Sequence, residues 1–259
     1  MSTNKRQPVL FLGHGSPMNA IEDNSFTRAL AALGRRLPRP KAILCVSAHW
    51  LTEGSVAGGM EKPRTIHDFG GFPEALYAVR YPAPGSPALA DRVRKLAGAS
   101  VDENEWGLDH GAWSVLRHLY PKADVPVVQL SIDMTASPRE KLELGRKLKP
   151  LRDEGVLILG SGNVVHNLRL ISFDENAPAA DWAAAFEDWV KGRLEARDAA
   201  ALADLSGAPS ARLAVPTPDH YDPLLYVVGA SDEKDALKIE IDGVQNRSIS
   251  MLSFGLGEW

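Results

Sequence analysis

The chain has 259 residues, 44% hydrophobic and 24% charged, a composition typical of a globular protein with a sizeable core. Its net charge of −4 gives no reason to expect a nucleic acid or an anionic membrane as a partner. Because Cys45 is the single cysteine, an intrachain disulfide and a cysteine-rich zinc site are excluded. No apolar run reaches the roughly 18 residues of a membrane span. We therefore expect a cytoplasmic protein, as a monomer or small homo-oligomer.

Seven short runs rich in Val, Ile and Leu predict β-strands. Several of them are apolar almost throughout, as in "VLFLG" and "VLILG", and this pattern is typical of strands covered on both faces. The predicted strands are Val9–Gly13, Ala42–Ser47, Ser55–Gly58, Val125–Ile132, Val156–Gly160, Leu237–Ile241 and Ile249–Phe254.

Helical patterns lie between these strands. One start signal is clear, with Ser137 as the N-cap, Pro138 at the first helical position and Glu140 at the third. The predicted helices are Ser25–Arg36, Ser86–Leu96, His110–Leu119, Pro138–Leu151 and Trp182–Asp204. Strands alternating with helices predict the α/β class, with a central, mostly parallel or mixed sheet flanked by helices. No repeat or linker divides the chain, so we expect a single catalytic domain over residues 1–259.

Four of the seven histidines lie where predicted elements begin or end. His14, His49 and His166 follow predicted strands, and His220 precedes a helical pattern in "PTPDHYDPLLYVVGA". Ligands of open α/β sheets bind beyond the carboxyl ends of the strands, and neutral imidazole is a common metal ligand. Taken singly, any one of these histidines fits a capping or hydrogen-bonding role. Together they favour a catalytic metal site with open coordination positions.

Competing motifs are incomplete. "GHGS" resembles a phosphate-binding turn but lacks the lysine of the P-loop, and "GSGNVV" lacks the third glycine of the dinucleotide fingerprint. Ser16 lies near a histidine, but outside the GxSxG motif of a serine nucleophile. We therefore assign no residue to an organic cofactor.

Seven motifs, in order along the chain, resemble those of the class III extradiol ring-cleaving dioxygenases. They read "GHGSPM", "SAHW", "TIHDFGGFP", "YPAPG", "GLDHGAW", "GSGNVVHNL" and "PTPDHYDPLLYVVGA". The resemblance runs from about Val9 to Phe254 and is in particular to the 4,5-DOPA dioxygenase branch. It implies one α/β domain with a mixed sheet. It also implies a metal-dependent oxidoreductase that opens the ring of a small catechol such as DOPA and incorporates both atoms of O₂.

The resemblance implies roles for five histidines. His14, His49 and His220 match the metal ligands, and His166 matches the active-site acid/base. His110 of "LDHGAW" matches a further catalytic histidine near the substrate. Protocatechuate-type members use a glutamate as the third ligand, so the implied site here is neutral rather than monoanionic.

Three imidazoles suit zinc and iron(II) alike. We expect one divalent metal ion per chain, with Zn²⁺ in the isolated protein, because zinc binds such sites more tightly than iron(II). Fe²⁺ is expected for the O₂ chemistry, because zinc has no accessible redox chemistry. Two alternatives use the same three histidines: a zinc-dependent Lewis-acid enzyme or hydrolase, and a non-catalytic binding protein.

Several neighbours of these histidines have two interpretations. Asp219 and Asp222 either orient His220 through its other ring nitrogen or serve as solvated charge and helix cap. We expect His118 to be structural, and the sequence assigns no role to His67. The aromatic residues beside the motifs either wall a substrate slot or pack in the core: Trp50, Phe69, Phe72, Trp113 and Tyr221.

Overall fold

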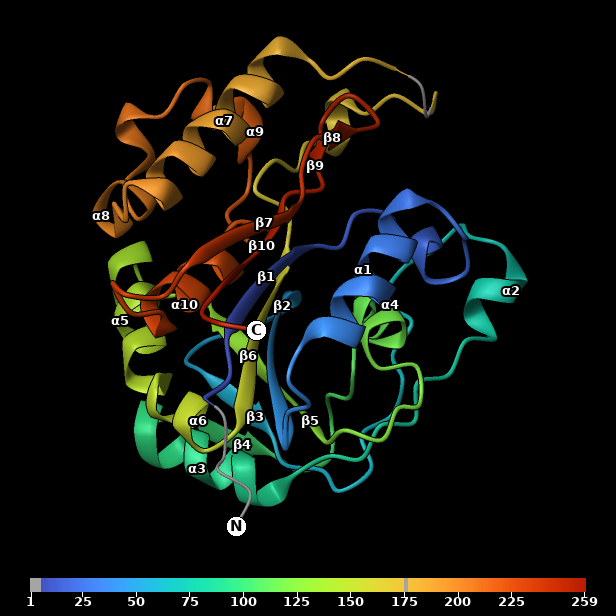
Figure 1. The fold of residues 1–259 in the computed structure, drawn as a ribbon. Helices are drawn as coiled ribbons and strands as arrows, with labels where there is room; N and C mark the ends of the chain where they lie inside the picture. Colours follow the sequence, from blue (N-terminus) through green and yellow to red (C-terminus); the bar gives the residue numbers. More distant parts are fainter. Residues whose placement is uncertain (1–5, 175–176) are drawn as a thin grey trace.

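An eight-stranded mixed sheet runs through the middle of the molecule, with helices on both faces (Figure 1). The structure is a computed structural model that describes residues 6–174 and 177–259, so residues 1–5 and 175–176 of the predicted domain lie outside it. The strand order is β4-β3-β5-β2-β6-β1-β10-β7. The predicted α/β class and mixed sheet are confirmed.

Two short strands, Ser100–Asp102 and Val244–Gln245, lie outside the predicted runs, and the other strands lie close to them. They are β1 (Val9–Gly13), β2 (Ala42–Thr52), β3 (Val56–Gly58), β4 (Ser100–Asp102), β5 (Val127–Asp133), β6 (Val156–Gly162), β7 (Leu237–Ile241) and β10 (Ser253–Leu256), with β8 (Val244–Gln245) and β9 (Ile249–Ser250) forming a separate pair. The neighbours β5, β2, β6 and β1 are parallel and almost wholly buried. Their carboxyl ends therefore meet at one edge of the sheet, where α/β proteins bind ligands.

Helices cover both faces of this sheet. The α-helices are α1 (Ser25–Arg36), α2 (Glu74–Tyr77), α3 (Pro87–Ala97), α4 (His110–Leu119), α5 (Pro138–Leu148), α6 (Pro150–Asp153), α7 (Asp181–Glu195), α8 (Ala199–Leu202), α9 (Ala211–Ala214) and α10 (Asp222–Ala230). One buried cluster joins the sheet to α1 and α4, and a second joins it to α3, α5, α7 and α10. Among the residues the structure describes, no helix combines the length and apolarity needed to cross a membrane.

Side chains of β1 show why a continuous apolar run is needed. Val9 and Phe11 pack into the cluster under α5, α7 and α10, whereas Leu10 and Leu12 pack into the cluster under α1 and α4. Because successive residues of a strand point to opposite faces, a central strand covered on both sides must be apolar at every position.

Two predicted helices are divided in the structure. The helix predicted over Pro138–Leu151 ends at Leu148, and Pro150 begins the separate α6, because proline has no N–H to continue the helical ladder. The helix predicted over Trp182–Asp204 ends at Glu195. Beyond it, Arg197 has a φ of 57°, a left-handed conformation that a helix cannot contain.

Two predicted strands also have different bounds in the structure. The run Ile249–Phe254 is divided, since β9 pairs with β8 whereas β10 pairs with β1 and β7. The strand predicted to end at Ser47, just before His49, continues to Thr52. His49 therefore lies within β2, in a stretch where the register against β5 is irregular. Such irregularities redirect side chains next to active sites.

Candidate active site

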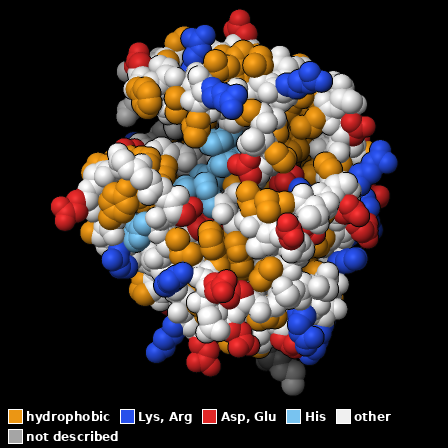
Figure 2. Space-filling model, turned by 180° about the vertical axis from the view of Figure 1, so that it is seen from behind, with side chains coloured by type: hydrophobic (Ala, Val, Ile, Leu, Met, Phe, Trp, Pro, Cys, Tyr) orange, Lys and Arg blue, Asp and Glu red, His pale blue; other side chains and the backbone are white. Residues whose placement is uncertain are grey.

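Five histidines that the sequence analysis selected come together at the carboxyl edge of the parallel strands. Figure 2 shows histidine side chains gathered in a hollow on one face of the molecule. They come from different elements: His14 follows β1, His49 lies in β2, His110 opens α4, His166 follows β6 and His220 precedes α10.

Three of these rings are close enough to share one ion. The ring centroids of His14, His49 and His220 lie 5.0–5.3 Å apart in pairs, and one ring nitrogen from each lies within 4.8 Å of the other two. The Nε2 atoms of His14 and His49 are 3.2 Å apart. Zinc–imidazole bonds are about 2 Å long, so two nitrogens bound to one ion are expected to lie about as far apart as this observed 3.2 Å. The donor set therefore fits a divalent metal.

The hydrogen bond at Nδ1 of His14 shows that the other ring nitrogen, Nε2, is free to bind a metal. His14 Nδ1 lies 3.0 Å from Ser161 Oγ, and the Ser161 hydroxyl donates its proton to the carbonyl of Gly111 at 2.5 Å. The serine oxygen is therefore an acceptor for His14 Nδ1–H, which leaves the lone pair on Nε2. Burial and the neighbouring His220 hold the pKa of His14 well below its ordinary value, so the ring is neutral, the form that binds metals.

A hydrogen bond at Nδ1 also orients the ring of His220. Its Nδ1 makes a hydrogen bond with the carboxylate of Asp219. Burial raises the pKa of Asp219. The hydrogen bond from the His220 ring and the electrostatic interaction with it outweigh burial, and the pKa of Asp219 lies well below its usual value. Asp222 points elsewhere, since it forms a buried ion pair with Lys141 at 2.5 Å between α10 and α5. Of the two carboxylates considered as partners of His220, only Asp219 makes the contact.

A carboxylate that was not predicted from the sequence, that of Asp68, contacts two of the histidines. Asp68 accepts hydrogen bonds from the backbone N–H of His110 at 2.8 Å and from its Nδ1 at 2.9 Å. The same carboxylate lies 3.4 Å from Nδ1 of His49. Burial raises the pKa of Asp68, but the hydrogen bonds and charge of His110 outweigh it and lower the pKa. An acidic residue inside the motif "TIHDFGGFP" was the available signal.

His166 differs from the other four histidines. Its ring stacks on that of His220, with centroids 3.5 Å apart and planes within 7°. Burial and the neighbouring His220 lower the pKa of His166 to about 3, so its ring is neutral near pH 7. Across residues 6–174 and 177–259 its ring nitrogens have no hydrogen-bond partner. Both ring nitrogens of this half-buried, neutral imidazole are therefore free to form a hydrogen bond with a ligand.

Two of the five aromatic residues lie beside the histidines. Phe69 meets the ring of His110 edge-on at 5.4 Å, and Phe72 contacts Phe69 at 5.3 Å. Both phenylalanines are half-buried, so they are positioned to form a wall of the hollow. The other three aromatic side chains are buried and pack in the interior: Trp50, Trp113 and Tyr221.

The remaining two histidines are tied to backbone carbonyls. His67 Nε2 lies 3.1 Å from the carbonyl oxygen of Val79, and His118 Nε2 lies 2.8 Å from that of Asn19. The contact of His118 agrees with the structural role expected for it.

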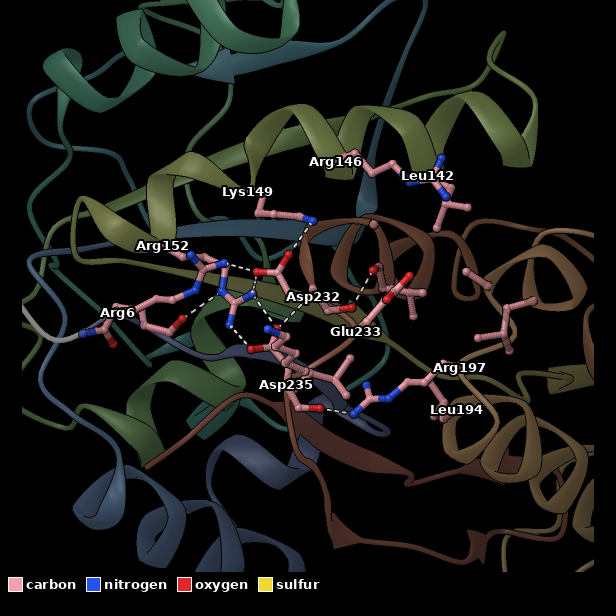
Figure 3. Close-up of a pocket in the computed structure, with 18 of the residues that line it drawn as sticks. Arg6, Leu142, Arg146, Lys149, Arg152, Leu194, Arg197, Asp232, Glu233 and Asp235 are labelled. Atoms are coloured by element: carbon pink, nitrogen blue, oxygen red, sulfur yellow. Dashed lines mark hydrogen bonds and ion pairs between the residues drawn. The ribbon is translucent and has the colours of Figure 1, made fainter.

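A large cavity lies away from the histidines (Figure 3). It has a volume of about 840 Å³ and is lined mostly by charged side chains near the ends of α5, α7 and α10. Many of these charges pair with one another: Arg152 is buried against Asp235, and Lys149 contacts Asp232 at 2.7 Å. Because no histidine is among its described lining residues, we interpret this cavity as part of an ion-pair network rather than as the catalytic site.

A mixed α/β sheet with three histidines at its carboxyl edge that could hold one ion is the arrangement of a metal-dependent α/β enzyme. Residues 8–257 match the family described as the catalytic LigB subunit of aromatic ring-opening dioxygenase. The chain belongs to this family, and it is a dioxygenase and thus an oxidoreductase that acts on an aromatic substrate and O₂. The family and the three histidines together support a divalent metal ion.

Named relatives are similar over nearly the whole chain. The 4,5-DOPA dioxygenase extradiol of Escherichia coli (strain K12) is 49% identical, over 97% of this chain and 95% of that protein. The 4,5-DOPA dioxygenase extradiol of Beta vulgaris is 38% identical, over 89% of each. A crystal structure of an uncharacterized protein from Escherichia coli K12 matches with a TM-score of 0.86 and 44% identity, over 97% of this chain and 100% of that one. These matches confirm the predicted resemblance to the class III extradiol dioxygenases.

Proposed function

We propose that this protein is an iron(II)-dependent extradiol dioxygenase that opens the ring of a small catechol such as DOPA. The observation that carries the proposal is the cluster of His14, His49 and His220, whose rings face one another while other side chains approach Nδ1 of each ring from outside. The relatives named 4,5-DOPA dioxygenase extradiol support the substrate class. We retain residues 1–259 as one catalytic domain. The cytoplasmic location, the monomeric or small homo-oligomeric state and the absence of nucleic-acid and membrane partners also remain predictions.

The metal assignment follows from the donor set. Three neutral imidazoles bind zinc more tightly than iron(II), so we propose that the isolated protein carries zinc. Held by His14, His49 and His220, iron(II) would supply the redox chemistry toward O₂ that zinc lacks.

The other two histidines act on the substrate itself. We assign to His166 the transfer of the catechol proton, which passes from a substrate hydroxyl to a ring nitrogen of His166 and returns to the ring-opened product. His110, held by Asp68, lies against His49 with ring centroids 3.9 Å apart and presents its Nε2 to the substrate. Phe69 and Phe72 supply an apolar wall against which an aromatic ring can pack.

The position of ring cleavage and the need for two hydroxyls test the proposed substrate class. With iron(II) bound, DOPA is expected to be cleaved beside its hydroxyls and not between them, giving a yellow semialdehyde product that contains both atoms of O₂. Tyrosine is expected to be inert, because a single hydroxyl cannot chelate the metal. Absorbance and mass spectrometry of the products, with both substrates run on one preparation, make the comparison. Turnover of tyrosine at the rate of DOPA would rule out this mechanism.

A further inference from the structure

Asp68 joins two histidines that come from different elements. Its Oδ2 lies 2.9 Å from Nδ1 of His110, at the start of α4, and 3.4 Å from Nδ1 of His49, in β2. Its Oδ1 accepts the backbone N–H of His110 at 2.8 Å. The Asp68 side chain is 14% exposed, so water competes little for these contacts. A single carboxylate therefore holds one proposed metal ligand and one proposed substrate-side histidine.

The loop that carries Asp68 is fixed by contacts other than those of its carboxylate. The backbone N–H of Ile66 donates to the carbonyl of Leu108 at 2.7 Å, and Trp113 Nε1 donates to the carbonyl of Ile66 at 2.7 Å. His67 is tied to the carbonyl of Val79. Removal of the Asp68 charge is thus expected to leave the course of the loop intact.

Two simpler roles for Asp68 agree less well with the structure. Capping of α4 is already provided by Asp109, which accepts the N–H of Ala112 at 3.1 Å. Direct metal binding is the other role, since Asp68, His49 and His110 also form a possible metal-binding trio. However, both oxygens of Asp68 already face N–H groups of His110, so the carboxylate acts as a hydrogen-bond acceptor.

We propose that Asp68 is a positioning residue that fixes His49 and His110 together, with Nε2 of each ring directed toward the reacting centre. Asp68 can only accept hydrogen bonds, so it fixes a proton on Nδ1 of His110, and its negative charge 3.4 Å from Nδ1 of His49 favours the same tautomer there, with the lone pair of each ring on Nε2. Ser161 and Asp219 do the same for His14 and His220, one ring each. The catalytic part of this proposal rests on the proposed function, whereas the part concerning metal binding does not.

The variant Asp68→Asn tests this role, because it keeps the size of the side chain but turns an N–H group toward the histidines. Asp102→Asn is the control: Asp102, the last residue of β4, is also a carboxylate that accepts backbone N–H groups, those of Asn104, Glu105 and Trp106. Four properties are measured: the Zn²⁺ dissociation constant by chelator competition, the visible spectrum of the Co²⁺-loaded protein, the melting temperature of the metal-free protein, and kcat for a catechol with saturating iron(II). Asp68→Ala is measured in parallel, as it removes the carboxylate without adding an amide.

Asp68→Asn and Asp68→Ala are expected to weaken Zn²⁺ binding by about 10- to 100-fold, the usual effect of losing a partner of a metal-bound histidine. We also expect changed Co²⁺ bands, a melting temperature close to that of the unmutated protein, and a lower kcat with saturating iron(II). A folded Asp68 variant with unaltered Zn²⁺ affinity and Co²⁺ spectrum would overturn the proposal, as would an equal loss in Asp102→Asn. If the unmutated protein consumes no O₂, the proposed function fails, but the Zn²⁺ and Co²⁺ measurements still decide the role of Asp68.

Discussion

Replacement of His14, His49 or His220 by alanine is expected to leave the purified protein nearly free of metal. Each ring offers one nitrogen within 4.8 Å of the other two, and two remaining imidazoles hold a divalent ion poorly. The loss of affinity should exceed the roughly 100-fold that removal of an outer hydrogen-bond partner can cause. Metal content per chain, measured after dialysis against a defined concentration of free Zn²⁺, gives the result.

His118→Ala is the control for these three variants. His118 is a half-buried histidine whose Nε2 lies 2.8 Å from the backbone carbonyl of Asn19, and it belongs to none of the possible metal-binding groups among the described residues, so its replacement should leave the metal content unchanged. A His220→Ala protein that stays fully loaded would show that His220 is not a ligand, and the three-histidine assignment would be wrong.

Replacement of His166 by alanine is expected to have the opposite pattern, with metal retained and turnover lost. The ring stacks face to face on His220 and has no hydrogen bond among the residues described, an arrangement that suits proton transfer with a substrate. Removal of a positioned general acid/base lowers the rate by roughly 10²- to 10⁴-fold. The measurement is kcat for a catechol with iron(II), alongside the metal content of the same sample. An empty His166→Ala protein beside a loaded His220→Ala protein would reverse the two assignments.

Much of the fold could be predicted because its signals are local. The bounds of β1, β7, α1 and α4 agree with the sequence, and the capping box that Ser137 and Glu140 form at the start of α5 is present as predicted. The continuation of β2 beyond Ser47 could not be predicted, because it depends on pairing with β5, a strand distant in the sequence. The end of α7 was missed for a different reason: the left-handed Arg197 has no glycine to mark it.

Some residues of the candidate site could likewise be predicted from the sequence, and others could not. The histidines could be selected from the sequence because strand ends in an α/β sheet share one edge. Asp219 was a foreseeable partner of His220, since the two residues are adjacent. Ser161 and Asp68 contact histidines that only the tertiary fold brings near them, and the one local signal was the acidic residue inside the motif "TIHDFGGFP". The partner of Asp222, a lysine on α5, is also set by helix packing rather than by sequence neighbours.

Oxygen consumption by the iron-loaded protein tests most directly whether this chain is a catechol-cleaving dioxygenase. The protein is stripped of metal, loaded anaerobically with iron(II) or with zinc, and assayed in an oxygen electrode with a panel of catechols that includes DOPA. We expect the zinc-loaded protein to bind catechols without consuming O₂, and the iron-loaded protein to consume one O₂ for each ring opened. Iron-loaded protein that binds catechols but consumes no O₂ with any of them would contradict the proposal. A zinc-dependent Lewis-acid enzyme or a binding protein on the same histidines would then be the better interpretation.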